Sequence, residues 1–506
     1  MTITFNNIPK TIRTPGAYGE VDPSRALTGL AQNPHKILIL GQKIAAGTVP
    51  FDTLVAITSD GLADGFFGPG SILARMCNVA KDNSPNIEMW AMALGSGIAG
   101  VQASAGLDLS LVRNSDGDYS GVGTIHMMVN GKRGGNFDLA ITSGMSTLRM
   151  ASLMVSVINA DSTLPVTATV SAVAASGGLV HFSAVCSGTQ GNYLDIRFNY
   201  DVGNSFPTGF SADLSTIVFA DGSVDPDLGD AWTVIDGERY NYIIQPYITA
   251  ANLTEIESEL ADRFEPLEDL QGHGFTAARA TQASATTLGN SRNSPHNTIM
   301  CAYDSPNAPE EWAATLGAVA GFNLNQDPAR PLHTLNLKGL LPPPVESRFT
   351  RSERDILLYD GIATWIVNSG GNVLIERCIT TYQKNALDIL DPTYLDIQTL
   401  ATLGELRDQW KIRMSNRFIT PRFKLADDGF PVQPGTFVAT PSTVKQEAIA
   451  LFTELRDAGL IENLADFIEN IRVERDASDR NRVNALLPPD LINQFRVLAG
   501  LFQFIL

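Results

Sequence analysis

Cysteine and histidine are scarce in this chain of 506 residues, and neither is clustered. The four cysteines are separated by long stretches and form no CxxC pair, so they indicate neither a zinc motif nor a disulfide framework. We expect buried, reduced thiols made in a cytoplasm. The six histidines are scattered too, and only Gly272-His273-Gly274 has an unusual setting. We expect packed or capping imidazoles, with no catalytic, metal or cofactor site built on them.

Positive charge is also in short supply. The chain has 54 acidic side chains against 36 basic ones, which leaves a formal charge of −18. Proteins bind nucleic acid mainly by neutralising phosphates with lysine and arginine. The composition therefore argues against direct contact with DNA or RNA.

Long apolar runs and a secretion signal are missing. The opening residues, MTITFNNIPK, lack the apolar core of a signal peptide. The longest uncharged run, from Met89 to Leu107, is interrupted by Gly, Ser and Gln, so it predicts a strand and loop rather than a membrane helix. We expect no membrane insertion.

Motifs for catalysis or cofactor binding are few and incomplete. Gly95-Ser-Gly97-Ile-Ala-Gly100 is a GxGxxG pattern, which binds dinucleotides when it lies between a strand and a helix. Here a second strand pattern follows it instead. Asp116-Gly-Asp118 resembles the start of a calcium loop, but Met127 stands where the closing glutamate belongs. Since P-loop, HExxH and GxSxG motifs are absent as well, we expect a protein that is not an enzyme.

The sequence does contain the pattern of several folded domains, as its length allows. Strands alternate with helices over residues 31–100 and 203–340, which predicts one discontinuous α/β domain. Residues 101–202 form short alternating strands with a hairpin signal at Asn130-Gly131, which predicts an inserted β-rich domain. Residues 1–30 are rich in Pro and Gly and predict an extended arm.

A further region follows the stiff sequence LLPPP at residues 340–344. We expect a separate α+β domain over residues 341–489, with ATWIV and NVLIERCITTYQ as strands and TLATLGELRDQWKIRMSNRF as a long helix. The helix is basic, and an acidic stretch follows it. These charges indicate either an internal salt-bridge network or a face that docks other protein copies. The basic candidates are Arg407, Lys411, Arg413 and Arg417.

Residues 490–506 end in an apolar strand. Alternate positions of an extended chain point to opposite sides, and both sides are apolar here. Such a strand is an aggregation hazard unless it is covered in its own subunit or pairs with the sheet edge of another chain. Its apolar side chains are Val497, Leu498, Leu501, Phe502, Phe504, Ile505 and Leu506.

Several segments resemble the Mu-like family of phage tail sheath proteins, and they run nearly from end to end. The C-terminal block VERDASDRNRVNALLPPDLINQFRVLAGLFQFIL carries most of the resemblance. Further matches are NVLIERCITTYQ, KLADDG, the opening IPKTIRTPGAY, FGPGSILARM in the α/β region, and INADSTLPVTATVSA with SGTQGNYLDIRFNY in the insert. The resemblance implies a central α/β domain sometimes called subtilisin-like in shape, without protease activity. It also implies a C-terminal domain facing the tail tube and an outward-facing insert.

The resemblance further implies a structural subunit of a contractile tail sheath, located in the virion tail and assembled in the host bacterial cytoplasm. Its partners would be copies of itself in hexameric rings stacked into a helix, the tail tube protein, and the baseplate and tail terminator proteins. Contraction would drive the tube through the host envelope during genome ejection, with no cofactor. Extended terminal arms would link subunits by strand addition. That places linking roles on Ile8, Ile12, Pro15 and Tyr18 as well as on the apolar C-terminal side chains.

Alternatives from other classes stay open. The sheath of a phage-derived contractile bacteriocin is biochemically equivalent. A nucleotide-binding enzyme rests on the single GxGxxG pattern and would be favoured by thermal stabilisation with NAD. A non-contractile capsid or tube protein rests on the β-rich insert and would form thin-walled tubes.

Overall fold

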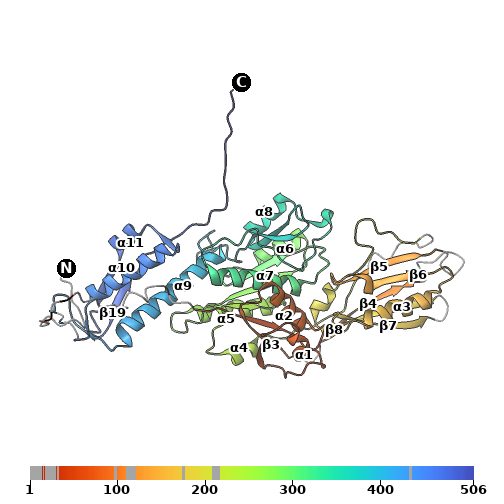
Figure 1. The fold of residues 1–506 in the computed structure, drawn as a ribbon, viewed down its shortest axis with the longest axis horizontal. Coiled ribbons are helices and arrows are strands. Elements are labelled where there is room, and N and C mark those ends of the chain that lie inside the picture. The colour runs from red at the N-terminus through yellow and green to blue at the C-terminus, as the bar shows by residue number, and fades with distance from the viewer. Residues whose placement is uncertain are drawn as a thin grey trace. The chain divides into compact units, whose positions relative to one another are not determined.

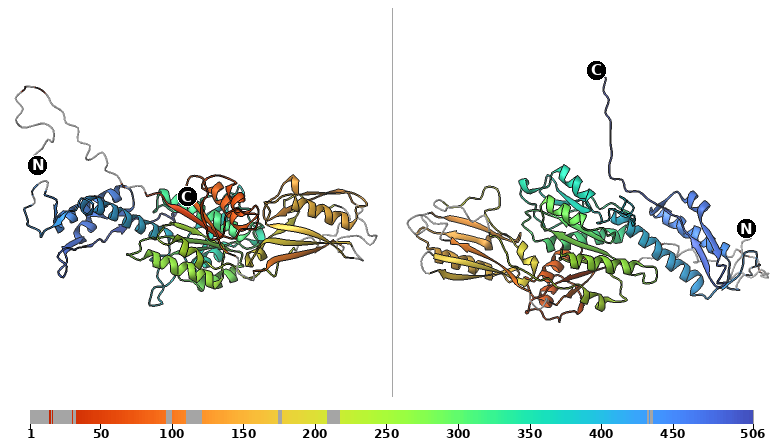
Figure 2. Two further views of the ribbon diagram at one scale, coloured as in Figure 1. Left: turned by 90° about the horizontal axis from the view of Figure 1, so that it is seen from below. Right: turned by 180° about the vertical axis from the view of Figure 1, so that it is seen from behind.

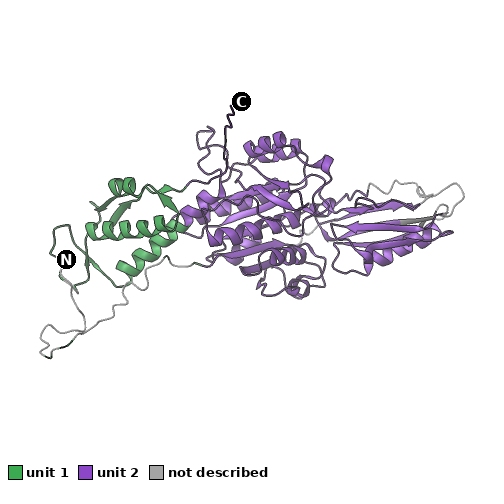
Figure 3. Cartoon of the chain, turned by 45° about the horizontal axis from the view of Figure 1, so that its top comes forward, with its two compact units in different colours: residues 1–33, 405–492 green, residues 34–404, 493–506 purple. Residues whose placement is uncertain are grey.

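The computed structural model describes residues 14, 16, 30, 33–95, 100–109, 121–173, 177–207, 217–431, 433 and 436–505. The chain divides into two compact units (Figure 3). Unit 1 comprises residues 1–33 and 405–492, and unit 2 comprises residues 34–404 and 493–506. The expected arm over residues 1–30 lies almost wholly outside the described residues.

The centre of unit 2 is an eight-stranded sheet in which six neighbouring strands run parallel (Figure 1). These strands are nearly continuous apolar runs, as expected for parallel strands that are buried on both faces. The two edge strands pair antiparallel with their neighbours. In spatial order the strands are β14 (Val373–Arg377), β13 (Ile362–Val367), β12 (Asn297–Cys301), β11 (His273–Ala278), β10 (Tyr242–Ile244), β1 (Lys36–Gly41), β3 (Glu88–Ala93) and β2 (Leu54–Ala56).

Helices cover both faces of this sheet and bury separate apolar clusters against it. Helices α2 and α6 begin at capping hydroxyls, because Ser71 and Thr281 accept hydrogen bonds from the backbone of their first turns. One face carries α1 (Leu62–Phe67), α2 (Ile72–Asn83) and α7 (Pro309–Gln326). The other carries α4 (Gly229–Ile235), α5 (Ala250–Phe264), α6 (Gln282–Asn290) and α8 (Arg351–Tyr359).

Helix α7 is the most deeply buried of these helices, and a glycine lets it approach the sheet. A Cβ atom at Gly317 would lie 2.6 Å from the Ile244 side chain. Any larger residue would therefore push α7 away from β10. This close packing holds the first turn of α7, which carries Glu310 and Glu311, in a fixed place.

The inserted β-rich region is present and has its own apolar core. Figure 2 shows it as a separate lobe at one end of unit 2. The expected boundary at residue 202 is wrong, because Phe219 packs in the core of the insert against Phe182 and Ser223 still bridges Val101 at the start of the insert. Its elements are β4 (Gln102–Asp108), β8 (Gly177–Ser187) and β7 (Val166–Val173) in one sheet, β6 (Asp138–Ile141), β5 (Gly123–Val129) and β9 (Ile196–Phe198) in another, and α3 (Thr147–Asn159).

The expected domain boundary at residue 341 is also wrong. The strands predicted in ATWIV and NVLIERC exist as β13 and β14, but they extend the central sheet instead of starting a new domain. The ring centroids of Trp365 on β13 and Trp312 on α7 lie 5.3 Å apart, and both side chains belong to the same apolar cluster. Unit 1 resumes at Glu405.

Unit 1 is built around the second half of the predicted long helix and a helix that follows it. Phe452 and Phe467 stack at 4.1 Å in its core. Short two-stranded sheets complete the unit. The elements are α9 (Ile397–Met414) with a π-helical turn (Ser415–Ile419), β15 (Lys424–Leu425), β16 (Val438–Ala439), α10 (Pro441–Asp457), β17 (Ile461–Glu462), α11 (Leu464–Asn470), β18 (Arg472–Arg475), β19 (Val483–Leu486) and β20 (Asp490–Leu491).

Candidate assembly sites

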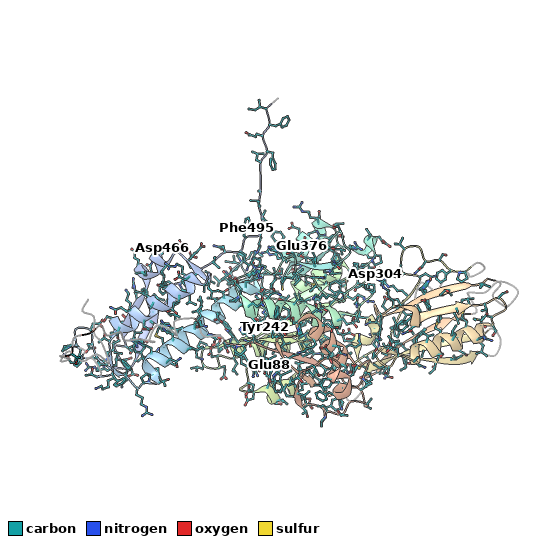
Figure 4. The ribbon with its side chains drawn as sticks, in the orientation of Figure 1. Glu88, Tyr242, Asp304, Glu376, Asp466 and Phe495 are labelled. Atoms are coloured by element: carbon teal, nitrogen blue, oxygen red, sulfur yellow. The ribbon has the colours of Figure 1, made fainter. Side chains whose placement is uncertain are left out.

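The end of the chain is an apolar segment without a strand partner in the described structure. Residues 493–505 form neither helix nor strand, and Figure 1 draws them as an extended trace. Beyond Phe495, side chains stand in solvent along this trace (Figure 4). The large apolar residues are between 72 and 101 % exposed: Phe495, Val497, Leu498, Leu501, Phe502, Phe504 and Ile505. Leu506 lies outside the described residues, as do Ile8, Ile12, Pro15 and Tyr18.

The base of this C-terminal segment is anchored by an ion pair. The Arg496 guanidinium lies 2.5 Å from the Asp396 carboxylate, which also pairs with Arg377 at 3.3 Å. These side chains are partly buried, and no apolar side chain of the segment is buried with them. The ion pair therefore fixes the start of the segment, while its large apolar side chains remain exposed to solvent.

Unit 1 contains small sheets with free edges. Strands β18 and β19 form an antiparallel hairpin that pairs with no other strand among the described residues. An isolated two-stranded sheet is marginally stable and gains from further strands. Beside it lies a groove of about 260 Å³ with an apolar lining. The lining includes Trp410, Met414, Phe418, Phe423, Val483 and Ala485.

The basic residues singled out on α9 have different settings. Arg413 pairs with Glu447 at 2.5 Å and with Glu454 at 2.9 Å, and Arg417 lies 3.4 Å from Glu447. Burial lowers the pKa of Arg413, but its hydrogen bonds to these two carboxylates and their charges outweigh that effect and raise it. Part of the charge pattern is thus an internal network. Lys411 is exposed and Arg407 is half-buried.

Three of the histidines that look scattered in the sequence gather around one cavity of about 50 Å³, at the amino edge of the parallel strands. His35 bonds the Tyr242 hydroxyl at 2.9 Å, and His273 Nε2 bonds the Thr298 hydroxyl at 2.8 Å. The third is His296. Among the described residues, no carboxylate, serine or cysteine lines the cavity. Strand order, which the sequence does not display, brings these histidines together.

Burial makes His273 a source of acid sensitivity. Desolvation, with a smaller contribution from the nearby His296, lowers its pKa to about 3 from an ordinary value of 6.5. The unfolded chain therefore binds a proton between pH 6.5 and 3 that the folded chain does not. Stability should fall on acidification through this window, by at most about 1.4 kcal/mol per pH unit from this group.

His273→Gln removes that titration, so the urea midpoint of the variant should change less between pH 7 and 5 than that of the wild type. His333→Gln, at an exposed position, is the matched control for the loss of a histidine side chain. Equal pH slopes for wild type and His273→Gln would contradict the assignment.

The remaining chemical motifs find little structural support. Residues 96–99 of the GxGxxG pattern lie outside the described residues, but the element that follows is β4, a strand instead of the helix that a dinucleotide site needs. All four cysteines are buried and free, as expected. The described residues contain no metal-ligand cluster, and none of their helices is long and apolar enough to cross a membrane. The Asp116-Gly-Asp118 loop is not described.

Two family models and a curated relative match this chain. The family described as phage tail sheath protein central domain matches residues 221–381, and the phage tail sheath C-terminal domain matches residues 390–505. The Mu-like prophage FluMu tail sheath protein of Haemophilus influenzae is 36% identical over 506 residues, covering 100% of both chains.

Solved sheath structures are similar at low identity. The contracted helical sheath of the anti-feeding prophage has a TM-score of 0.48 at 10% identity, covering 97% of this chain and 99% of that one. The sheath tail protein from Desulfitobacterium hafniense has a TM-score of 0.47 at 12% identity, covering 94% and 100%. Both scores lie below 0.5, so the assignment rests on the sequence matches. On those matches, the chain belongs to the phage tail sheath protein family, as its sequence predicts.

Proposed function

We propose that this chain is the repeating subunit of a contractile sheath that polymerises around a tail tube, and that its C-terminal segment links one subunit to another. The observation that carries the proposal is the exposure of the apolar side chains in residues 495–505. An extended apolar segment with unpaired backbone groups is a ready template for strand addition to another chain. Family membership supplies the assembly in which such copies meet.

The receiving edge that fits best is the β18–β19 hairpin of another subunit. It lacks neighbouring strands among the described residues, and Val483 and Ala485 of β19 line the apolar groove. A strand added along this edge could satisfy its own backbone groups and place alternate side chains in the groove. The N-terminal arm, with Ile8, Ile12, Pro15 and Tyr18, is a second linking strand in this proposal.

The linked subunits form stacked hexameric rings around the tube protein and end at the baseplate and terminator. They assemble in an extended, kinetically trapped form and later slide into a shorter, wider one. A preference of about 1–3 kcal/mol per subunit, the usual scale of conformational coupling, becomes large over many copies. No nucleotide takes part, and the arms keep subunits joined while their other contacts change.

In this proposal the movement drives the tube through the host envelope for genome ejection, and the sheath is a component of the virion tail that assembles in the bacterial cytoplasm. The exposed Lys411 and the partly paired Arg417 are candidates for contact with the tube or a neighbouring subunit. A contractile bacteriocin would use the same subunit chemistry.

Electron microscopy of the purified full chain, with and without tube protein, tests this function. We expect hollow polymers with walls several domains thick, and contraction of assembled tails in buffer without ATP. Thin tubes with walls of one domain would instead support a non-contractile tube protein. Monomers that stay unassembled even on added tube protein, or a strict need for ATP in contraction, would rule out the proposal.

A further inference from the structure

The junction between the insert and the central sheet contains a buried polar cluster, beside the apolar contacts that Val185 and Cys186 of the insert make with the central core. Arg75 of α2 pairs with both Glu310 and Glu311 in the first turn of α7, at 2.6 Å for Glu311. All three side chains are buried. Charges this deep are costly unless their hydrogen-bonding groups are satisfied.

The insert reaches this ion pair with a tight turn. Asn130 and Gly131 both have positive φ, as the two-residue hairpin signal predicts. The turn places the Asn130 amide 2.7 Å from Glu311 Oε1, to which it donates. Asn307 donates to the other oxygen of Glu311, also at 2.7 Å. Glu311 is therefore fully satisfied by groups from both sides of the junction.

Glu310 and Gln190 are less well satisfied. Glu310 Oε2 has no hydrogen-bond partner, and the same holds for Arg75 Nε and for both amide atoms of Gln190. Glu310 and Gln190 are each 1 % exposed. The side chains of Arg75, Gln190 and Glu310 line one small cavity between the insert and the central domain. Its volume is about 10 Å³. That is close to the smallest space that holds one internal water.

We propose that this cavity is a binding site for one internal water molecule that bridges Gln190 of the insert and Glu310 of the central domain. The unpartnered atoms include two acceptors, Glu310 Oε2 and Gln190 Oε1, and two donor groups, Arg75 Nε and Gln190 Nε2. Water both donates and accepts, so it matches this mixture, whereas a metal cation would face the two donors. A dry cavity would leave four buried polar atoms unsatisfied, each at a cost comparable to a lost hydrogen bond.

Hydrogen bonds through the bound water fix the orientation of the insert on the central domain. Apolar contacts alone would let the insert slide over the central domain, because they have no preferred direction. Hydrogen bonds through the water and through Asn130 fix one orientation. The insert then moves with the central domain as one body.

Gln190→Met in the full chain tests the site by the sign of its effect. If a water bridges Gln190 and Glu310, the variant leaves the water and the carboxylate with fewer partners, and the thermal unfolding midpoint should fall by about 2–4 °C. If the cavity is dry, the variant removes an unsatisfied amide and the midpoint should rise. A midpoint that rises or stays unchanged overturns the proposal. Gln446→Met, at an exposed position on α10, is the control and should change little.

A high-resolution map of the assembled protein provides the direct test, and it decides the matter if Gln190→Met does not fold. We expect density within hydrogen-bonding distance of Gln190 and Glu310. An empty cavity in a map that resolves other buried waters would overturn the site.

Discussion

Deleting residues 496–506 should abolish polymerisation and leave the subunit folded. Among the described residues of the deleted segment no large apolar side chain is buried. The fold loses the ion pair between Arg496 and Asp396 and the hydrogen bonds of Arg496 to the neighbouring Gln494. A partly exposed pair of this kind contributes about 0–1 kcal/mol. We therefore expect a nearly unchanged thermal midpoint, together with monomers instead of tubes in electron micrographs and sedimentation.

Single substitutions in the same segment sharpen this prediction. Phe502→Asp should weaken polymerisation strongly, because a charge cannot enter an apolar groove without a large desolvation cost. Gln503→Ser changes an exposed polar neighbour and should assemble normally. A synthetic peptide of residues 495–506, added in excess, should compete with the tethered segment. Tubes that form equally well from the deletion variant would exclude the segment as the link.

The sequence predicts the central layers well because local and tertiary signals agree there. Ser71 and Thr281 begin helices, and apolar runs such as β1 and β12 become strands buried on both faces. The sequence also shows that the C-terminal segment is apolar on both faces, but it leaves open whether the segment pairs within its own subunit or with another chain. Alternate side chains of a strand point to opposite faces, so a strand with two apolar faces must be covered on both of them to be buried.

Partners that are distant in the sequence could not be predicted in the same way. The residues ATWIV predict a strand, but nothing in them indicates that this strand pairs with β12 instead of starting a new sheet. Phe219 likewise gives no local sign that it belongs to the insert. The wrong boundaries at residues 202 and 341 both come from this lack of information about non-local pairing.

The polar junction is the clearest case of missed information. Arg75 and Glu311 are 236 positions apart, and Asn130 and Glu311 are 181 apart. One signal was available, because Glu310 and Glu311 open a helix that is otherwise nearly all apolar. The helix dipole favours acidic side chains at a helix N-terminus. This local effect is enough to explain Glu310 and Glu311, so the sequence gives no reason to expect a buried arginine as their partner.

Replacing Arg75 with Met should cost about 3–5 kcal/mol in the free energy of unfolding. The change removes one partner of a buried pair and leaves two carboxylates without their counter-charge. Burial already raises the pKa of Glu311, and Arg75 opposes that rise. Without Arg75 the pKa of Glu311 should rise further. Folded carboxyls with raised pKa values take up protons more readily than unfolded ones, so the deficit of the variant should shrink as the pH falls towards 5.

Urea unfolding of matched variants separates this effect from the loss of any arginine. Arg133→Met breaks an ion pair with Asp201 in which both side chains are about half exposed, and should cost at most about 1 kcal/mol. Adding Glu310→Gln to Arg75→Met removes one unpaired charge and should recover part of the stability. If Arg75→Met is no more destabilising than Arg133→Met, the buried ion pair does not stabilise the packing of α2 against α7. The apolar contacts of α7 then account for that packing alone.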